Sequence, residues 1–358
     1  MMINNTIPLN ILQQDIQDLG IAAAPRAKRL TGDASGREYF RVHLAGASPD
    51  SMILMHFDPT QALVSDEFVG RSAARPKELP FITVQRFLAR AGLPVPGILL
   101  DRVSQGRLWL DDLGDNTMYN MIQGIDRPGL VETYKNAIDL LVSFQLATFT
   151  RLDDFQSQIS QKAFDQELLL WECHHFVEWL IEALHDTSVT GDLKTSLDAM
   201  FEEVVSGITA MPYIPVHRDF QSKNIMIHND TYHIIDFQDM LMGPVVYDLV
   251  ALLRDSYIEL ATDELDRLTA YYHQHALAAG LPVPAAMEEF RNLFTLQTLQ
   301  RKMKDAGRFV FIDRVKHNDS FLQYIPATLR YVAAAFDRLP QYDDVRRELA
   351  RIEERLAP

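Results

Sequence analysis

The feature that most constrains the fold of this chain is the octapeptide His-Arg-Asp-Phe-Gln-Ser-Lys-Asn at residues 217–224. It matches the pattern His-Arg-Asp-x-x-x-x-Asn, which places an aspartate and an asparagine on one loop. Two short strands are expected at residues 225–227 and 233–235, with Asn229-Asp230 at the turn between them, which predicts a β-hairpin directly after that loop. A loop followed by a hairpin brings three polar side chains to one point: Asp219, Asn224 and Asp236.

These three side chains suit phosphoryl transfer, in which catalysis is mostly a matter of alignment and charge. One carboxylate has to lie beside the attacking hydroxyl and accept its proton, and we assign this role to Asp219. Oxygen ligands are needed to hold Mg²⁺ against the phosphates of a nucleotide, and we assign these to Asn224 and Asp236. A chance tripeptide and a surface carboxylate are the alternative, which the combination with the hairpin disfavours.

The rest of the sequence indicates a β-rich first part and a larger helical second part. Apolar and polar residues alternate in residues 38–44, as in a half-buried strand, whereas from about residue 116 apolar residues recur every three or four positions, as on one face of a helix. Strands are expected at residues 38–44, 52–57, 97–100 and 107–110. Helices are expected at residues 11–19, 79–91, 130–141, 166–184, 193–208 and 246–257, and onward to residue 356.

Two segments of the first part are candidates for nucleotide binding. One is the loop Gly32, Asp33, Ala34, Ser35, Gly36 and Arg37 between two expected strands, whose small residues would let backbone amides approach phosphates. An ordinary hairpin turn is the alternative. The other is the segment at residues 111–115, with Asp112 and Leu113 as its candidate contacts, at the change from strands to helices. It is either a hinge whose backbone contacts adenine or a charged linker.

Composition excludes several classes of protein. The formal net charge of −15 argues against a protein that coats nucleic acid or an anionic membrane. The single cysteine, Cys173, cannot form a disulfide framework or a cysteine-type zinc site, which fits a reducing compartment. We find neither a signal-peptide pattern nor an apolar run of about 18 residues, and therefore expect a cytoplasmic protein.

The sequence resembles the aminoglycoside phosphotransferase and choline kinase-like superfamily over residues 30–326. Within it, the sequence is similar to bacterial anomeric kinases of N-acetylmuramate and N-acetylglucosamine, which act in peptidoglycan recycling. The segments that carry this resemblance are residues 32–41, 219–224, 235–239, 243–249, 253–255 and 299–309.

The resemblance implies an α+β, two-lobed protein-kinase-like fold. Its small β-rich lobe would comprise residues 1–113 and bind nucleotide, and its mainly helical lobe would comprise residues 114–358. ATP and Mg²⁺ would be the cofactors, Asp219 the base, and Asn224 and Asp236 the metal ligands. A small-molecule sugar would be the partner of a monomeric enzyme.

One position departs from the usual kinase pattern. The third strand normally carries a lysine that binds phosphates, but residues 51–57 contain none, and Met55 stands at the expected place. Arg37 or Arg41 could supply the missing charge. The resemblance also proposes four substrate contacts, for which a solvated ion pair or a solvated helix face is the alternative: Arg254, Asp255, Arg301 and Lys304. Asp248 is expected to bond the catalytic loop or to cap a helix.

Other functions remain open at this point. The same fold could serve an aminoglycoside, choline or homoserine kinase, although the basic pair Arg301 and Lys304 favours a neutral or acidic sugar. A pseudokinase that binds nucleotide without turnover is the alternative from another class. Its support is the missing strand lysine, and the presence of the three polar side chains named first argues against it.

Overall fold

The structure is a computed structural model that describes residues 2–3, 7–30, 37–59, 78–158 and 162–358. The chain forms two compact units. The N-terminal unit comprises Met1–Asn116 and Met226–Asp239, and the C-terminal unit comprises Thr117–Ile225 and Met240–Pro358. The segment with Asp236 therefore belongs to the N-terminal unit, whereas it was predicted to lie in the C-terminal lobe of residues 114–358.

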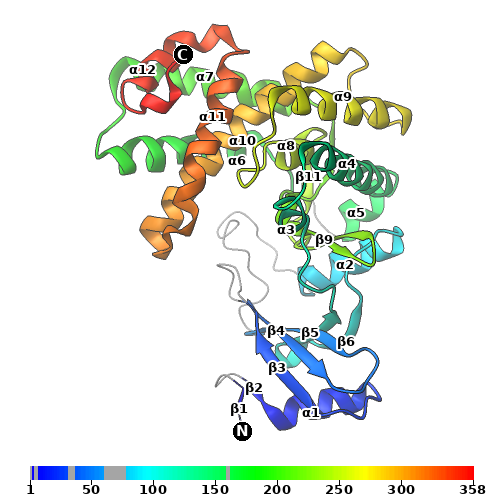
Figure 1. The fold of residues 1–358 in the computed structure, drawn as a ribbon. Coiled ribbons are helices and arrows are strands. Elements are labelled where there is room, and N and C mark those ends of the chain that lie inside the picture. Colours follow the sequence, from blue (N-terminus) through cyan, green and yellow to red (C-terminus); the bar gives the residue numbers. More distant parts are fainter. Residues whose placement is uncertain (1, 4–6, 31–36, 60–77, 159–161) are drawn as a thin grey trace. The chain divides into compact units, whose positions relative to one another are not determined.

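The N-terminal unit is built on a five-stranded antiparallel sheet in the order β3-β4-β5-β7-β6 (Figure 1). Its strands are β3 (Pro25–Arg29), β4 (Arg37–Leu44), β5 (Ser51–Phe57), β6 (Ile98–Arg102) and β7 (Arg107–Asp111). The other elements before Asn116 are β1 (Met2–Ile3), β2 (Ile7–Pro8), α1 (Leu9–Asp18) and α2 (Pro80–Arg90). The four strands and two helices predicted in this region are confirmed, with ends shifted by one or two residues.

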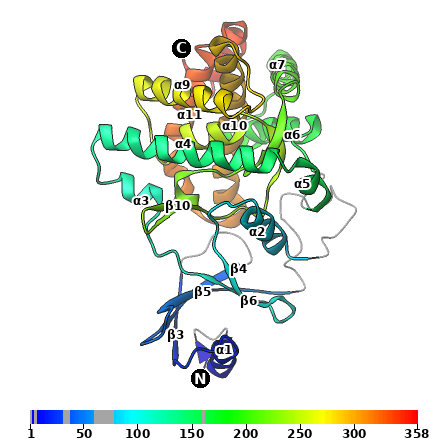
Figure 2. The same ribbon diagram turned by 90° about the vertical axis from the view of Figure 1, so that its right-hand side faces the viewer.

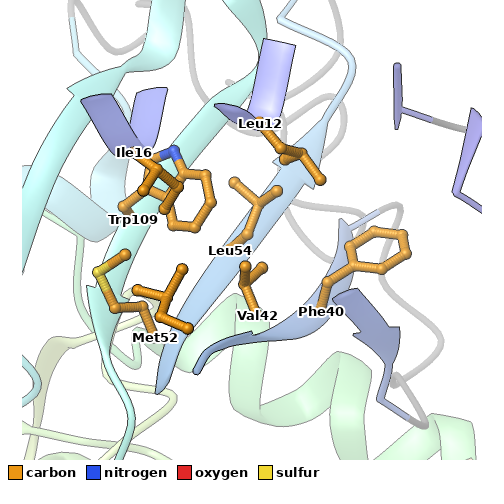
Figure 3. Packing of buried hydrophobic residues seen from close by; sticks show 8 residues of the cluster. Leu12, Ile16, Phe40, Val42, Met52, Leu54 and Trp109 are labelled. Atoms are coloured by element: carbon orange, nitrogen blue, oxygen red, sulfur yellow. The ribbon is translucent and has the colours of Figure 1, made fainter. Parts of the chain in front are cut away.

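Helix α1 covers one face of this sheet. Leu12 and Ile16 of the helix pack against Val42, Leu54 and Trp109 of three adjacent strands (Figure 3). The strand alternation explains this arrangement, since every second residue of β4 points toward the helix. A buried carboxylate, Asp15, also fixes the helix to β7, because it accepts hydrogen bonds from the Arg107 and Trp109 side chains at 2.7 and 3.0 Å.

The predicted hairpin consists of β9 (Ile225–His228) and β10 (Thr231–Ile234). Asn229 and Asp230 at its turn have φ angles of 48° and 58°. A two-residue turn with both central residues in the left-handed region matches the twist of a hairpin, and asparagine and aspartate tolerate that region better than most residues. The prediction of this hairpin is confirmed.

The C-terminal unit is mainly helical, and α4 and α9 lie side by side in it (Figures 1 and 2). Its α-helices are α3 (Met118–Ile122), α4 (Arg127–Phe149), α5 (Leu152–Gln158), α6 (Gln166–Phe176), α7 (Gly191–Thr209), α8 (Tyr247–Leu253), α9 (Thr262–Ala278), α10 (Met287–Lys316), α11 (Ile325–Phe336) and α12 (Asp343–Ala350). A π-helical stretch, Val177–Ala183, continues α6. Within the described ranges, no helix is both long and apolar enough to cross a membrane.

Long helix α10 approaches the backbone of α6 closely at one glycine. A Cβ atom on Gly307 would lie 2.6 Å from the carbonyl oxygen of His175 and 2.9 Å from the Cα of Phe176. These separations are shorter than real Cβ contacts, so only glycine permits this approach of the two helices.

Two features of the C-terminal unit differ from the prediction. The strands β8 (Tyr213–Val216) and β11 (Leu241–Pro244), which pair antiparallel, were not predicted. The helix expected at residues 246–257 ends at Leu253, because Arg254 leaves the helical conformation with ψ at 31°. All seven residues of α8 are buried, and the amphipathic pattern gave no signal for where such a helix stops.

Candidate active site

The loop at residues 217–224 is held in an unusual backbone conformation. Arg218 has a φ angle of 78°, in the left-handed region that non-glycine residues rarely adopt. The carboxylate of Asp248 on α8 accepts hydrogen bonds from the backbone amides of His217 at 2.7 Å and Arg218 at 3.0 Å. Such strain persists only where surrounding contacts fix it. The expectation that Asp248 bonds the catalytic loop is therefore confirmed.

We expect Asp248→Asn to lower the free energy of unfolding by about 1–3 kcal/mol. The asparagine side chain has one oxygen that accepts, but its NH2 group would face the second of the two buried backbone N–H groups and leave it without an acceptor. Burial raises the pKa of Asp248 to about 6, against the lowering effect of His217. The folded protein thus holds this proton more tightly than the unfolded chain, and the contribution of Asp248 to stability declines as pH rises through that pKa. Urea unfolding at pH 7, where the ionised carboxylate accepts from both amides, should show this cost, and no measurable cost there would contradict the role of Asp248 as an anchor of the loop.

A second buried carboxylate, Asp255, fixes the other end of the loop. It accepts hydrogen bonds from the backbone amide and hydroxyl of Ser222, at 3.0 and 2.5 Å, and from the amide of Tyr257 at 3.0 Å. The Asp255 side chain has no exposed surface. The prediction that Asp255 contacts the substrate is therefore wrong, because burial and three hydrogen bonds commit both of its oxygens to the protein.

Asp219 lies on the stretch between these two anchors. Its side chain is 46% exposed, and one carboxylate oxygen accepts a hydrogen bond from Nη2 of Arg301 at 3.1 Å. Asn224 donates from its amide nitrogen to the Asp219 carbonyl at 2.9 Å, which leaves the amide oxygen of Asn224 to accept a further partner. The loop thus presents an accessible carboxylate, beside a cation, together with an amide oxygen suited to a hard metal ion.

Arg301 was predicted to contact the substrate, and the structure places it against the loop at residues 217–224. It lies on α10 with 1% of its surface exposed, and its guanidinium covers the Tyr247 ring at 4.7 Å. Its Nε and Nη1 atoms have no hydrogen-bond partner among the described residues, and Nε lies 3.9 Å from Asp305. The solvated helix face considered as an alternative is wrong for this residue, since the side chain is buried.

Asp305 is surrounded by three cations from the same helix. Its carboxylate lies 2.7 Å from Nζ of Lys302 and 3.1 Å from Nζ of Lys304, in addition to Arg301. Burial alone would raise the pKa of Asp305, but these cations hold it far below its usual range. The Lys304 side chain is 16% exposed, so a solvated helix face is wrong for it as well. The other predicted substrate contact, Arg254, packs its guanidinium against the Tyr331 ring at 5.0 Å.

In the N-terminal unit, Asp236 follows β10 with a φ angle of 62°. Gln238 donates from Nε2 to its carboxylate at 2.8 Å. The next residue, Phe237, is fully buried and packs on the Phe81 ring of α2 at 4.9 Å. An aromatic contact therefore holds the residue after Asp236, and a side-chain hydrogen bond holds the Asp236 carboxylate.

The residues of the predicted hinge make contacts within the N-terminal unit. The carboxylate of Asp112 accepts hydrogen bonds from Arg41 at 2.7 and 3.1 Å, and the Leu113 carbonyl lies 3.2 Å from Nδ1 of His228. Arg41 also bonds the Asp115 carboxylate and the Gly114 carbonyl. Arg41 is therefore committed to this network and is not the replacement for the missing lysine.

Arg37 remains the candidate for that replacement. It begins β4 opposite Phe57, while Met55, at the expected lysine position, is buried within β5 between Tyr39 and Leu108. The other residues of the predicted phosphate loop lie outside the described part of the chain: Gly32, Asp33, Ala34, Ser35 and Gly36.

Residues 26–290 match the phosphotransferase enzyme family, APH. This chain belongs to that family. The phosphotransferase is 28% identical to an N-acetylmuramate/N-acetylglucosamine kinase of Pseudomonas putida, over 90% of this chain and 87% of that protein. It is 29% identical to a kinase of the same name from Neisseria meningitidis serogroup B, over 88% of this chain and 84% of that protein.

The fold agrees with a solved structure as well. A putative aminoglycoside phosphotransferase of Ralstonia eutropha superposes with a TM-score of 0.61 at 11% identity, over 92% of this chain and 97% of the other. The predicted two-lobed, protein-kinase-like fold is confirmed. The chain is an enzyme, an ATP-dependent phosphotransferase with an alcohol group as acceptor.

Sequence reasoning missed several residues that shape this phosphotransferase site. Lys302 and Asp305 carry no motif, and their importance comes from burial beside Arg301. Three tyrosines around Lys223 come from segments far apart in the sequence: Tyr119, Tyr257 and Tyr324. The single available signal was the resemblance at residues 299–309, which pointed to α10 but not to the roles of its residues.

Proposed function

We propose that this phosphotransferase transfers the γ-phosphate of ATP to the anomeric hydroxyl of N-acetylmuramate or N-acetylglucosamine. The observation that carries the proposal is the half-exposed Asp219 carboxylate, fixed beside Arg301 on a loop with two buried anchors. Relatives named for these two sugars, matching 84–87% of their own length, support this choice of acceptor.

In the proposed mechanism, Asp219 orients the sugar hydroxyl and accepts its proton as the oxygen attacks the γ-phosphorus. The new O–P bond forms as the bond between that phosphorus and the bridging oxygen of ADP breaks. Arg301 holds the Asp219 carboxylate in the direction of attack. Mg²⁺, when bound, would neutralise charge on the phosphates, and the oxygen donors of Asn224 and Asp236 are the ligand type that it prefers.

Nucleotide binding is assigned to the N-terminal unit. We assign the phosphates to residues 32–37 and the base to the backbone at Asp112 and Leu113, as the sequence predicts. The side chain of Asp112 contributes indirectly, since its bonds with Arg41 fix the segment that would face the base.

We expect Arg37→Ala to raise the KM for ATP by about tenfold, because a cation that binds phosphates contributes on the order of 1.4 kcal/mol. The matched control is Arg29→Ala, which removes an arginine from the neighbouring strand, where it pairs with Glu38 at 2.8 Å. Steady-state kinetics with varied ATP would test this. An unchanged KM for Arg37→Ala, or an equal rise for Arg29→Ala, would contradict the assignment.

The direct test is ADP release with ATP and Mg²⁺ against N-acetylmuramate, N-acetylglucosamine, glucose, kanamycin, choline and homoserine. We expect turnover on the two N-acetylated sugars and a product phosphate that is stable to alkali but labile to acid, as an anomeric phosphate is. Turnover confined to kanamycin, choline or homoserine would replace the proposed acceptor. Nucleotide binding without turnover on any of them would favour the pseudokinase.

A further inference from the structure

The ammonium group of Lys223, on the catalytic loop, lies inside a cage of three tyrosine rings. Its Nζ atom is 3.5 Å from the centre of the Tyr257 ring and 5.1 Å from the centres of the Tyr119 and Tyr324 rings. Tyr257 stands nearly perpendicular to both other rings, at 74° and 85°, so the rings form the walls of a box. All four residues are partly exposed.

This box is tied to the catalytic loop by one carboxylate. Asp255 bonds Ser222, directly before Lys223, and also bonds the backbone amide of Tyr257. The lysine and the nearest wall of the box are thus fixed to a common point. Burial and the negative charges of Asp255, Asp305 and Asp219 raise the pKa of Tyr257 far above its usual value.

Several aromatic rings around a cation form the arrangement by which proteins recognise ammonium ligands, because each ring face attracts positive charge. Here the chain itself supplies the cation. We propose that Lys223 determines acceptor specificity by occupying an ammonium site beside the catalytic loop. The lysine fills the box and repels a second cation, so that choline-like and polyamine acceptors are excluded, while neutral or carboxylate-bearing acceptors are tolerated.

Titration calorimetry of the full chain with choline would test this directly. We expect Lys223→Ala to bind choline at least tenfold more tightly than the wild type, because the emptied box accepts the trimethylammonium group. Lys223→Arg, which keeps a cation in the box, is the matched control and should bind choline as weakly as the wild type. The double variant Lys223→Ala/Tyr257→Leu should lose the gain, since its box lacks the nearest wall.

Equal choline affinity in the wild type and in folded Lys223→Ala would overturn the inference, as would a gain that persists in the double variant. Thermal melting checks that each variant is folded, and Lys223→Ser serves as a second opening variant if alanine does not give folded protein. The inference rests on the proposed function for its account of acceptor choice, but the binding measurement needs no turnover. A gain in choline binding by Lys223→Ala, with no sugar turnover by the wild type, would reject the proposed function alone. Sugar turnover by the wild type, with no gain in choline binding by Lys223→Ala, would reject the inference alone.

Discussion

Asp219→Asn is expected to lower kcat by about 10² or more, while the affinity for ATP remains close to that of the wild type. Asparagine keeps the shape of the side chain and an oxygen that can accept the bond from Arg301, but it cannot take the proton of the acceptor hydroxyl. The effect should therefore appear in turnover rather than in folding. Steady-state kinetics and a nucleotide-dependent thermal shift, measured on the same preparation, separate the two.

A matched control for this variant is Asp263→Asn on α9, whose carboxylate is 74% exposed and pairs with Arg267. It should keep wild-type turnover. If Asp219→Asn retained near-normal turnover with a folded chain, Asp219 would not be the proton acceptor, and the mechanism proposed for this loop would have to be abandoned.

Asp305→Ala is expected to lower the free energy of unfolding by about 3–5 kcal/mol, because it leaves buried cations without their carboxylate. The pKa of Asp305 in the folded protein lies far below its unfolded value. Its stabilising contribution is therefore complete above the unfolded pKa, near 4, and is lost only as pH falls toward the folded pKa. At neutral pH the full cost should appear in urea unfolding followed by circular dichroism.

Asp313→Ala, on the same helix, is the matched control for this prediction. Asp313 lies 3.6 Å from Arg314, whose side chain is 54% exposed, and pairs of this kind contribute at most about 1 kcal/mol. A cost for Asp305→Ala no larger than that of Asp313→Ala would mean that Lys302, Lys304 and Arg301 find other compensation.

The parts of the fold that could be predicted are those governed by local pattern. The hairpin after the catalytic loop follows from its turn residues and apolar runs, and β4 follows from its alternation. Strands β8 and β11 were not predicted, because each has only four residues and pairs with a strand that is distant in the sequence. The strand propensity of a short segment does not indicate which distant segment it pairs with.

The candidate site shows the same division. Asp219 and Asn224 are adjacent in a motif, so their grouping is visible in the sequence, and the role of Asp248 followed from its place on the helix after the hairpin. The roles of Asp255 and Arg301 were not visible, because both depend on burial. A charged residue on a helix is solvated far more often than buried, and only tertiary contacts identify the exception.

The glycine contact between α6 and α10 has a consequence for mutations that look remote from the chemistry. Arg301 is carried by the same rigid helix that touches the α6 backbone at Gly307. The axial register of α10 against α6 therefore sets where the guanidinium meets the Asp219 carboxylate. A bulkier residue in place of Gly307 would shift the whole helix. The Arg301 guanidinium would then be misaligned with the Asp219 carboxylate, although the substituted residue does not contact that carboxylate.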